Sequence, residues 1–171
     1  MRINARYIAF LGLFLALSVA AGYFERILPP IAPALPGIKL GLPNTAVIVL
    51  MYIKDYKTAF LLNVLRVIIS GMLFSGLWGT FYALFGALFS FAAMALLKKT
   101  GAFGSVGVSA AGGVFHNFGQ ICAGTLFAGV ELFYYFPVLI VFGAASGAVV
   151  GYLSGLIIIR LNKSKIRSIF L

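Results

Sequence analysis

A few separated polar side chains interrupt an otherwise apolar sequence, and their types are those that bind ligands. His116 and Gln120 are four residues apart, so they lie on one face of a helix. Asn63, Arg66 and Ser70 share a second helical face, at spacings of three and four. Imidazole, amide and guanidinium groups provide directional hydrogen bonds, and the guanidinium adds a positive charge. The residues that we predict to bind a ligand are Arg66, Lys39, Asn44, His116, Asn117 and Gln120.

Acidic residues are too scarce to support most catalytic chemistry. The chain contains three, Glu25, Asp55 and Glu131, and no two of them are closer than 30 positions. They therefore do not form the carboxylate cluster that holds magnesium against a diphosphate. With one cysteine, Cys122, an internal disulfide and a cysteine metal cluster are excluded. No GxxxxGK[ST] motif is present, so ATP-driven work would need a partner. We expect a protein without catalytic residues, metal or cofactor.

Positive charge exceeds negative charge where the polar residues gather. Glu25 and Arg26 are adjacent and form a candidate ion pair, although Glu25 could instead pair with Lys39 or Arg66. Three cations and one carboxylate leave two excess positive charges in an apolar environment, and an anionic ligand would neutralise them. His116 could instead be a hydrogen-bonded core histidine, and the amides could simply join helices. The sequence leaves these alternatives open.

The elements that must position these residues are membrane helices. The chain is 63% apolar and 9% charged, whereas soluble domains are about 45–50% apolar and about 25% charged. A spanning helix needs about 20 apolar residues, and six stretches reach or approach this length. We therefore predict an all-α membrane protein with a single domain over residues 1–171. The predicted spans are Tyr7–Leu28, Ile38–Ile53, Thr58–Leu73, Leu77–Leu97, Ser105–Ala128 and Leu132–Leu161.

The second predicted span is short and interrupted. It contains Lys39 and Pro43, so we expect it to be broken or to cross only part of the membrane. Four prolines precede it, at positions 29, 30, 33 and 36. Because proline disfavours helix, we expect a stiff, extended loop between the first two spans.

Basic residues predict the orientation of the spans. Ten of the 13 Lys and Arg residues fall on one side of the six-span arrangement, and this side should be cytoplasmic. We therefore expect a multi-pass protein of the bacterial cytoplasmic membrane with both termini in the cytoplasm. The start of the chain also resembles a cleavable signal peptide, but we expect it to be retained.

Small residues form a stripe along the first predicted span. They advance by three or four positions and stay within a face about 80° wide. Such a face lets another helix approach closely, either from the same chain or from a separate membrane subunit. The sequence supports both possibilities. The stripe consists of Ala5, Ala9, Gly12, Ala16 and Ala20.

Glycine repeats every four residues in the last predicted span. Small residues at this spacing are widespread in membrane helices and permit close contact between them. We therefore predict that this face packs against another helix of the same chain. The repeat consists of Gly143, Gly147, Gly151 and Gly155.

Four sequence features along nearly the whole chain resemble one family. They are the strings ERILP at 25–29, PGIKLGLPN at 36–44 and HNFGQ at 116–120, together with Arg66. These features are similar to those of the Gx transporter family, which is also named heptaprenyl diphosphate synthase component I. The synthase name conflicts with the missing carboxylate cluster, and we give the chemistry more weight.

The resemblance implies a six-helix protein similar to the substrate-binding S components of energy-coupling factor (ECF) transporters. Such proteins work with a membrane T component and two ATPases, and an Ala-rich face of their first helix docks to the partner. The implied ligand is small and anionic or amphipathic, with quinone-related, isoprenoid and flavin-like molecules as candidates. Two alternatives stay open, a non-transporting subunit associated with prenyl-lipid synthesis or membrane electron transfer, and a membrane enzyme.

Overall fold

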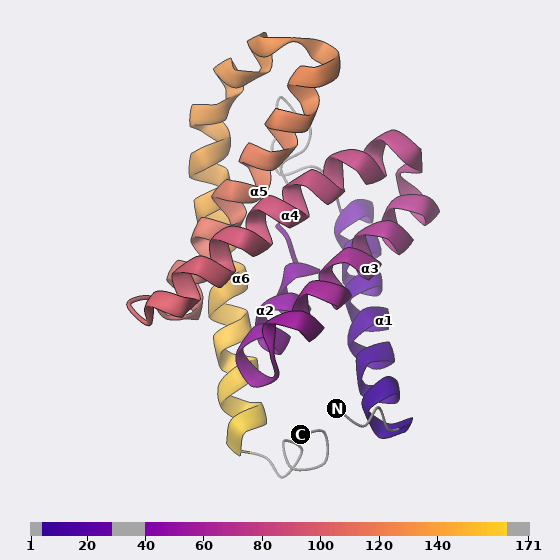
Figure 1. Ribbon diagram of the computed structural model, residues 1–171, viewed down its shortest axis with the longest axis vertical. Helices are drawn as coiled ribbons and strands as arrows, with labels where there is room; N and C mark the ends of the chain where they lie inside the picture. Colours follow the sequence, from indigo (N-terminus) through magenta and orange to yellow (C-terminus); the bar gives the residue numbers. More distant parts are fainter. Residues whose placement is uncertain (1–4, 29–39, 164–171) are drawn as a thin grey trace.

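The computed structural model describes residues 5–28 and 40–163, and every regular element in these two ranges is a helix. The predicted all-α class is therefore confirmed. The prolines at positions 29–36 and Lys39 lie outside the described residues. The elements, in order, are α1 (Ala5–Ile27), α2 (Asn44–Ile53), α3 (Tyr56–Phe74), α4 (Gly76–Thr100), α5 (Ser105–Ala128), the 3₁₀ helix η1 (Val130–Tyr135) and α6 (Phe136–Lys163) (Figure 1).

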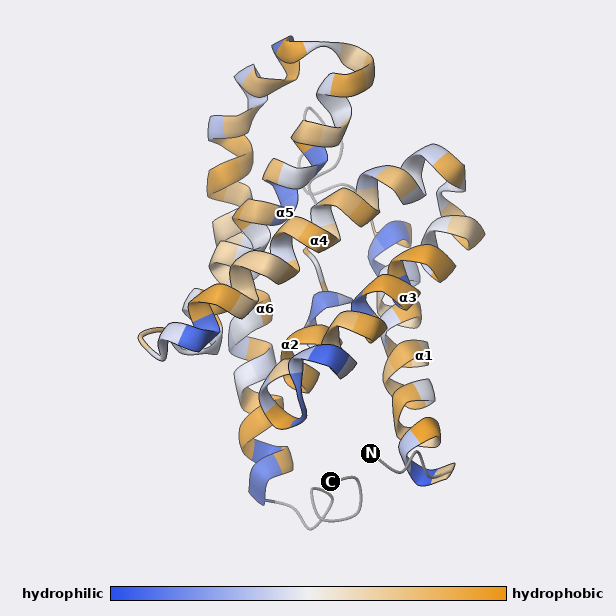
Figure 2. Ribbon diagram, in the orientation of Figure 1, coloured by the Kyte–Doolittle hydropathy of each residue, from blue (hydrophilic) through white to orange (hydrophobic). Residues whose placement is uncertain are grey.

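Four stretches of the described residues are long and apolar enough to cross a membrane. They are α1, α3, α4 and the continuous segment Val130–Lys163, which contains η1 and α6. Helix α5 has 24 residues but carries the polar string around His116 and is not one of the four. Many large apolar side chains are exposed, as expected for contact with lipid. Apolar residues make up most of the helical ribbon (Figure 2). The chain is thus a membrane protein, with four rather than six such stretches.

Helix α2 is much shorter than the span predicted for Ile38–Ile53. It has ten residues, and at about 1.5 Å per residue it covers roughly half of a hydrocarbon core of about 30 Å. The helix cannot begin earlier because Gly41 has a φ of +80°, a left-handed conformation outside the helical region. Pro43 occupies the N-cap position without a side-chain hydrogen bond, and the Asn44 N–H donates to Gly41 O at 2.9 Å. The prediction of a partial span is therefore correct, and its predicted start was wrong.

Helix α2 nevertheless forms the centre of the core. The five side chains of residues 47–51 are at most 1% exposed. At the end of this helix, the Lys98 ammonium donates to the Met51 carbonyl. The same ammonium lies over the Tyr52 and Tyr56 rings, 4.7 and 4.5 Å from their centroids. Lys98 thus ties the end of α4 to the end of α2.

The glycine repeat forms a close seam between α6 and α5. Gly143, Gly147 and Gly151 are buried, and a Cβ at Gly151 would lie 2.6 Å from Ser105 O. A Cβ at Gly147 would overlap the Ser109 backbone. The prediction that this repeat packs against a helix of the same chain is confirmed.

The small-residue stripe of α1 faces away from the rest of the protein. All five of its residues are exposed, and no atom lies within 4 Å of a Cβ added at Gly12. The opposite side of α1 makes the internal contacts, where Phe10 is buried and Ser18 donates to Pro43 O at 2.9 Å. The structure therefore contradicts the alternative in which the stripe packs against another described helix of the same chain. The stripe consists of Ala5, Ala9, Gly12, Ala16 and Ala20.

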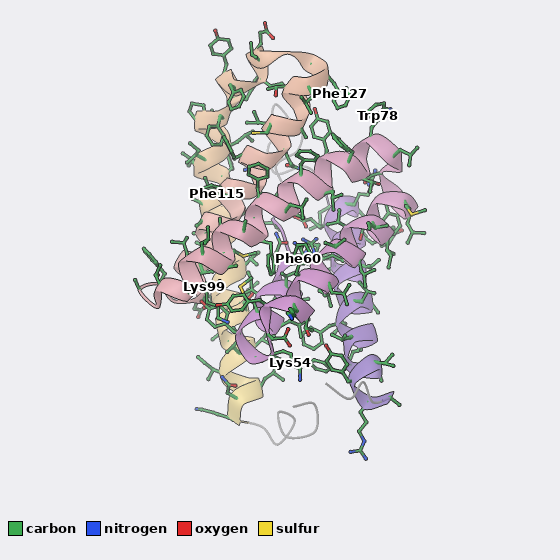
Figure 3. All side chains as sticks on the ribbon, in the orientation of Figure 1. Lys54, Phe60, Trp78, Lys99, Phe115 and Phe127 are labelled. Carbon is green, nitrogen blue, oxygen red and sulfur yellow. The ribbon has the colours of Figure 1, made fainter. Side chains whose placement is uncertain are left out.

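The two ends of the molecule differ in their side chains. The start of α1, the end of α6 and the α2–α3 connection lie toward one end, whereas the α5–η1–α6 connection forms the opposite end (Figure 1). Lys54 and Lys99 lie in the half with the α2–α3 connection (Figure 3). Trp78 and Phe127 lie toward the other end, with ring centroids 4.9 Å apart (Figure 3). Lys54 and Lys99 are thus separated from Trp78 and Phe127 along the long axis (Figure 3).

Candidate ligand-binding cavity

A cavity of about 160 Å³ lies between the helices, and all six α-helices contribute to its lining. Five of the six residues predicted to bind a ligand line it, as does the candidate pair Glu25 and Arg26. The sixth, Lys39, lies outside the described residues. The tertiary structure thus brings together residues that are up to 95 positions apart in the chain, from Glu25 to Gln120. The five residues are Asn44, Arg66, His116, Asn117 and Gln120.

Arg66 is held in place by two asparagines. Its Nη2 donates to Asn44 Oδ1 at 2.5 Å and to Asn63 Oδ1 at 2.7 Å. The Asn63 amide in turn donates to the Ala87 carbonyl of α4 at 3.1 Å, which fixes the orientation of this amide. Arg66 is only 8% exposed, and its Nε is buried without a hydrogen-bond partner among the described residues. A buried donor without an acceptor destabilises the folded state. A ligand with an acceptor atom in the cavity would remove this cost.

Glu25 stabilises the turn that places Asn44 beside Arg66. Its carboxylate accepts a hydrogen bond from the Gly41 N–H at 2.6 Å, and its negative charge attracts the Arg66 guanidinium. Arg26 projects differently, because its Nη1 donates to Ser75 Oγ at 2.8 Å. The predicted ion pair of Glu25 and Arg26 stays a prediction. A carboxylate that orders a glycine turn explains why Glu25 lies at this position.

The three predicted residues of α5 have different surroundings. His116 and Gln120 both pack against Gly86 of α4, where a Cβ would lie 2.9 Å from each side chain. The absence of a side chain at Gly86 therefore lets both residues fit between α4 and α5. The Asn117 amide donates to the Leu139 carbonyl at 2.7 Å and so joins α5 to α6. Asn117 lines the cavity and also has the helix-joining role that the sequence left open.

Ser90 is a cavity residue that sequence reasoning missed. It is 2% exposed, and its Oγ is buried without a hydrogen-bond partner in the described part of the chain. Ser90 lies in the apolar string LFSFAAMA of α4, where no spacing distinguishes it from a serine bonded to its own helix. Its role depends on which residues of the other helices lie opposite, so the sequence contains no signal for it.

The chemical character of the cavity is polar and positively charged. Its described lining includes the cations Arg26 and Arg66 and the carboxylate Glu25, which leaves a formal charge of +1 when His116 is neutral. No group of three or more His, Cys, Asp or Glu residues in the described ranges is arranged to hold a metal ion. The arrangement provides donors for hydrogen bonds and one net positive charge, as a binding site for a polar or anionic ligand does.

Fold and cavity define an all-helical membrane protein with a buried polar site. Residues 14–157 match the family described as heptaprenyl diphosphate synthase component I, and the chain belongs to this family. Its description names one component of a synthase and so implies a partner component. Comparison with curated proteins and with solved structures gives no significant match.

Proposed function

We propose that this chain is the substrate-binding membrane subunit of an ECF-type importer, similar to an S component. The observation that carries the proposal is the buried cavity, where Arg66 is held by two asparagines and has a buried donor without an acceptor in the described part of the chain. A membrane protein that only packs helices would have no reason to retain such a donor, because it destabilises the folded state. The ligand is small and anionic or amphipathic.

In this proposal, both termini and the Lys98–Lys99 end of α4 face the cytoplasm. Lys98 and Lys99 lie over the Tyr56 ring, and Lys54 lies over the Tyr7 ring near the start of α1. These lysines support the orientation, since basic residues concentrate on the cytoplasmic side. The cavity then lies in the outer half of a single transmembrane domain.

The proposed partners are a membrane T component and two ATPase subunits. The exposed stripe of small residues on α1 supports a docking role, since it contacts no described helix of its own chain. Close approach of a partner helix to this face would bury the stripe, and van der Waals packing is the main attraction between helices in lipid. The family description also implies a partner, without naming it.

The alternative function is a non-transporting subunit associated with prenyl-lipid synthesis, which the family description favours. In this alternative the partner performs the catalysis, because the chain has three acidic residues and none are close in sequence. The purified chain, incubated with allylic and isopentenyl diphosphates, should therefore give no chain elongation. Elongation that EDTA abolishes would show that the chain is itself an enzyme.

Co-purification separates the two functions. The tagged chain is extracted gently from its native membrane, and its protein partners and retained small molecules are identified by mass spectrometry. An importer subunit should retain two ATPases and a small ligand, and Arg66→Gln should lose the ligand. Retention of a prenyl-diphosphate synthase without ATPases would favour the alternative. A folded protein with no ligand in the wild type and no partner would contradict both.

A further inference from the structure

We propose that the cavity recognises a compact monoanion through a carboxylate group, and that it does not accept an isoprenyl diphosphate. The inference rests on the proposed function of this cavity as a binding site, and it specifies the chemical class of the ligand. Three independent features of the site carry it, namely its volume, its charge and its unpartnered donors.

The volume limits the size of the ligand. The cavity measures about 160 Å³, whereas pockets that enclose drug-sized ligands measure about 300–1,000 Å³. The walls have little room to retreat, because a Cβ at Gly112 would lie 2.7 Å from Met94 and 3.2 Å from Ser90 Oγ. The space suits a compact molecule or the polar head of one, and a long isoprenyl chain would have to lie elsewhere.

The charge limits the ionic state of the ligand. Arg66 is the buried cation of the described lining, whereas Arg26 is exposed and donates to Ser75 Oγ. A carboxylate matches one guanidinium, whereas a diphosphate carries at least two negative charges at neutral pH and needs more positive charge than Arg66 alone provides. Proteins usually neutralise a diphosphate with magnesium and clustered carboxylates, and the described residues contain no such cluster.

The donors identify the group that is recognised. Nη2 of Arg66 donates to Asn44 and Asn63, and its Nε–H is a buried donor that has no acceptor in the described ranges. The Ser90 hydroxyl is another buried polar group of the lining that has no hydrogen-bond partner among the described residues. A carboxylate has two acceptor oxygens and no donor when ionised, so it matches buried donors of this kind. Charge-assisted hydrogen bonds of this kind are the stronger ones.

The test is calorimetric titration of the full chain in detergent with three probes. Benzoate is a compact monoanion, benzamide is its neutral analogue of similar shape, and geranyl diphosphate is an isoprenyl polyanion. We expect benzoate to bind at least tenfold more tightly than either of the other two. Arg66→Gln should remove this preference. Comparable binding of benzamide, tighter Arg66-dependent binding of geranyl diphosphate, or no benzoate binding at millimolar concentration would each overturn the inference.

A second variant is needed because Arg66→Gln also removes contacts between helices. Ser90→Ala removes one hydroxyl and should weaken benzoate binding about tenfold, as expected for a lost hydrogen bond to a charged group. Ser154→Ala is the matched control, since Ser154 is fully buried but donates to Val150 O within its own helix. It should bind benzoate as wild type does. Equal affinity in both serine variants would contradict the assignment of Ser90.

Failure of this inference is distinguishable from failure of the proposed function. If a neutral molecule or a diphosphate co-purifies with the wild type and is lost in Arg66→Gln, the inference is overturned and the cavity is still a binding site. If no small molecule co-purifies and no probe binds, both are overturned.

Discussion

Arg66 and Asn44 are 22 positions apart in the chain, and the Arg66 Nη2 donates to Asn44 Oδ1 at 2.5 Å. This hydrogen bond joins the middle of the long helix α3 to the first residue of the short helix α2. Asn44 is itself fixed, because its N–H donates to Gly41 O and the Gly41 N–H donates to Glu25. The guanidinium is therefore oriented before any ligand arrives, and preorganisation of this kind reduces the entropy lost on binding.

Replacement of Arg66 should separate binding from folding. Hydrogen bonds to a charged group contribute about 1.5–3 kcal/mol each. If Arg66→Ala removes one or two of them, binding of the retained ligand should weaken by about one to four decades. Arg66→Lys should recover only part of this loss, because an ammonium lacks the planar arrangement of donors. Titration in detergent measures the affinity, and thermal unfolding controls for folding. Wild-type affinity together with a much lower melting temperature would mean that Arg66 is purely structural.

Lys39 provides a comparison with Arg66. It lies outside the described residues and is nearer in sequence to the predicted external loop than Arg66 is, so we expect its charge to be better hydrated. We expect Lys39→Ala to weaken binding less than Arg66→Ala does, and the effect should shrink as salt concentration rises, because salt screens exposed charges. Titrations at low and high salt measure this difference. A larger loss for Lys39→Ala at both salt concentrations would show that Lys39 is the principal anion-binding residue.

Replacement of two different glycines by alanine should affect the stability of the protein differently. A Cβ at Gly147 overlaps the Ser109 backbone, so Gly147→Ala must push α5 and α6 apart and should destabilise the protein by about 1–3 kcal/mol. A Cβ at Gly12 meets nothing within 4 Å, so Gly12→Ala should be neutral or slightly stabilising. Thermal unfolding in detergent measures both. Equal melting temperatures would contradict the close α5–α6 seam.

The exposed stripe of α1 should bind a partner. The double variant Ala9→Leu with Ala16→Leu places two larger side chains on this face, and they would hold a partner helix away. The ATPases should then no longer co-purify, whereas ligand binding and the melting temperature should not change. The control variant Leu13→Ile with Leu17→Ile changes exposed residues of the same helix at constant volume. It should keep the partner. Retention of the ATPases by the folded alanine-to-leucine variant would contradict docking through this stripe.

Labelling should report the orientation. Lys99 and Glu131 are both exposed. Lys99 lies in the half with the α2–α3 connection (Figure 3), and η1, which contains Glu131, belongs to the connection at the opposite end (Figure 1). Single cysteines at these positions, in a Cys122→Ala background, should react with a membrane-impermeant reagent from opposite sides of the membrane. Lys99→Cys should react only after the cells are opened, and Glu131→Cys in intact cells. Reaction of both in intact cells would contradict the proposed orientation.

Helix positions were predictable because each is set by a local apolar run with polar or glycine residues at its ends. The predicted Ser105–Ala128 coincides with α5, and Leu77–Leu97 falls within α4. The start of α2 was not predictable in this way. It depends on the left-handed turn at Gly41, and Glu25, 16 positions earlier, holds that turn.

The sequence by itself determined the class of protein, the helical face that Asn63 and Arg66 share, and the absence of a carboxylate cluster, because these depend on composition and on spacings of a few residues. Only the tertiary structure decided that Asn44 meets Arg66, that Ser90 lies in the cavity, and that the α1 stripe is exposed. Each of these relationships joins different helices. Helices in lipid associate through shape and through a few hydrogen bonds, and such complementarity is not encoded in the spacing within any one helix.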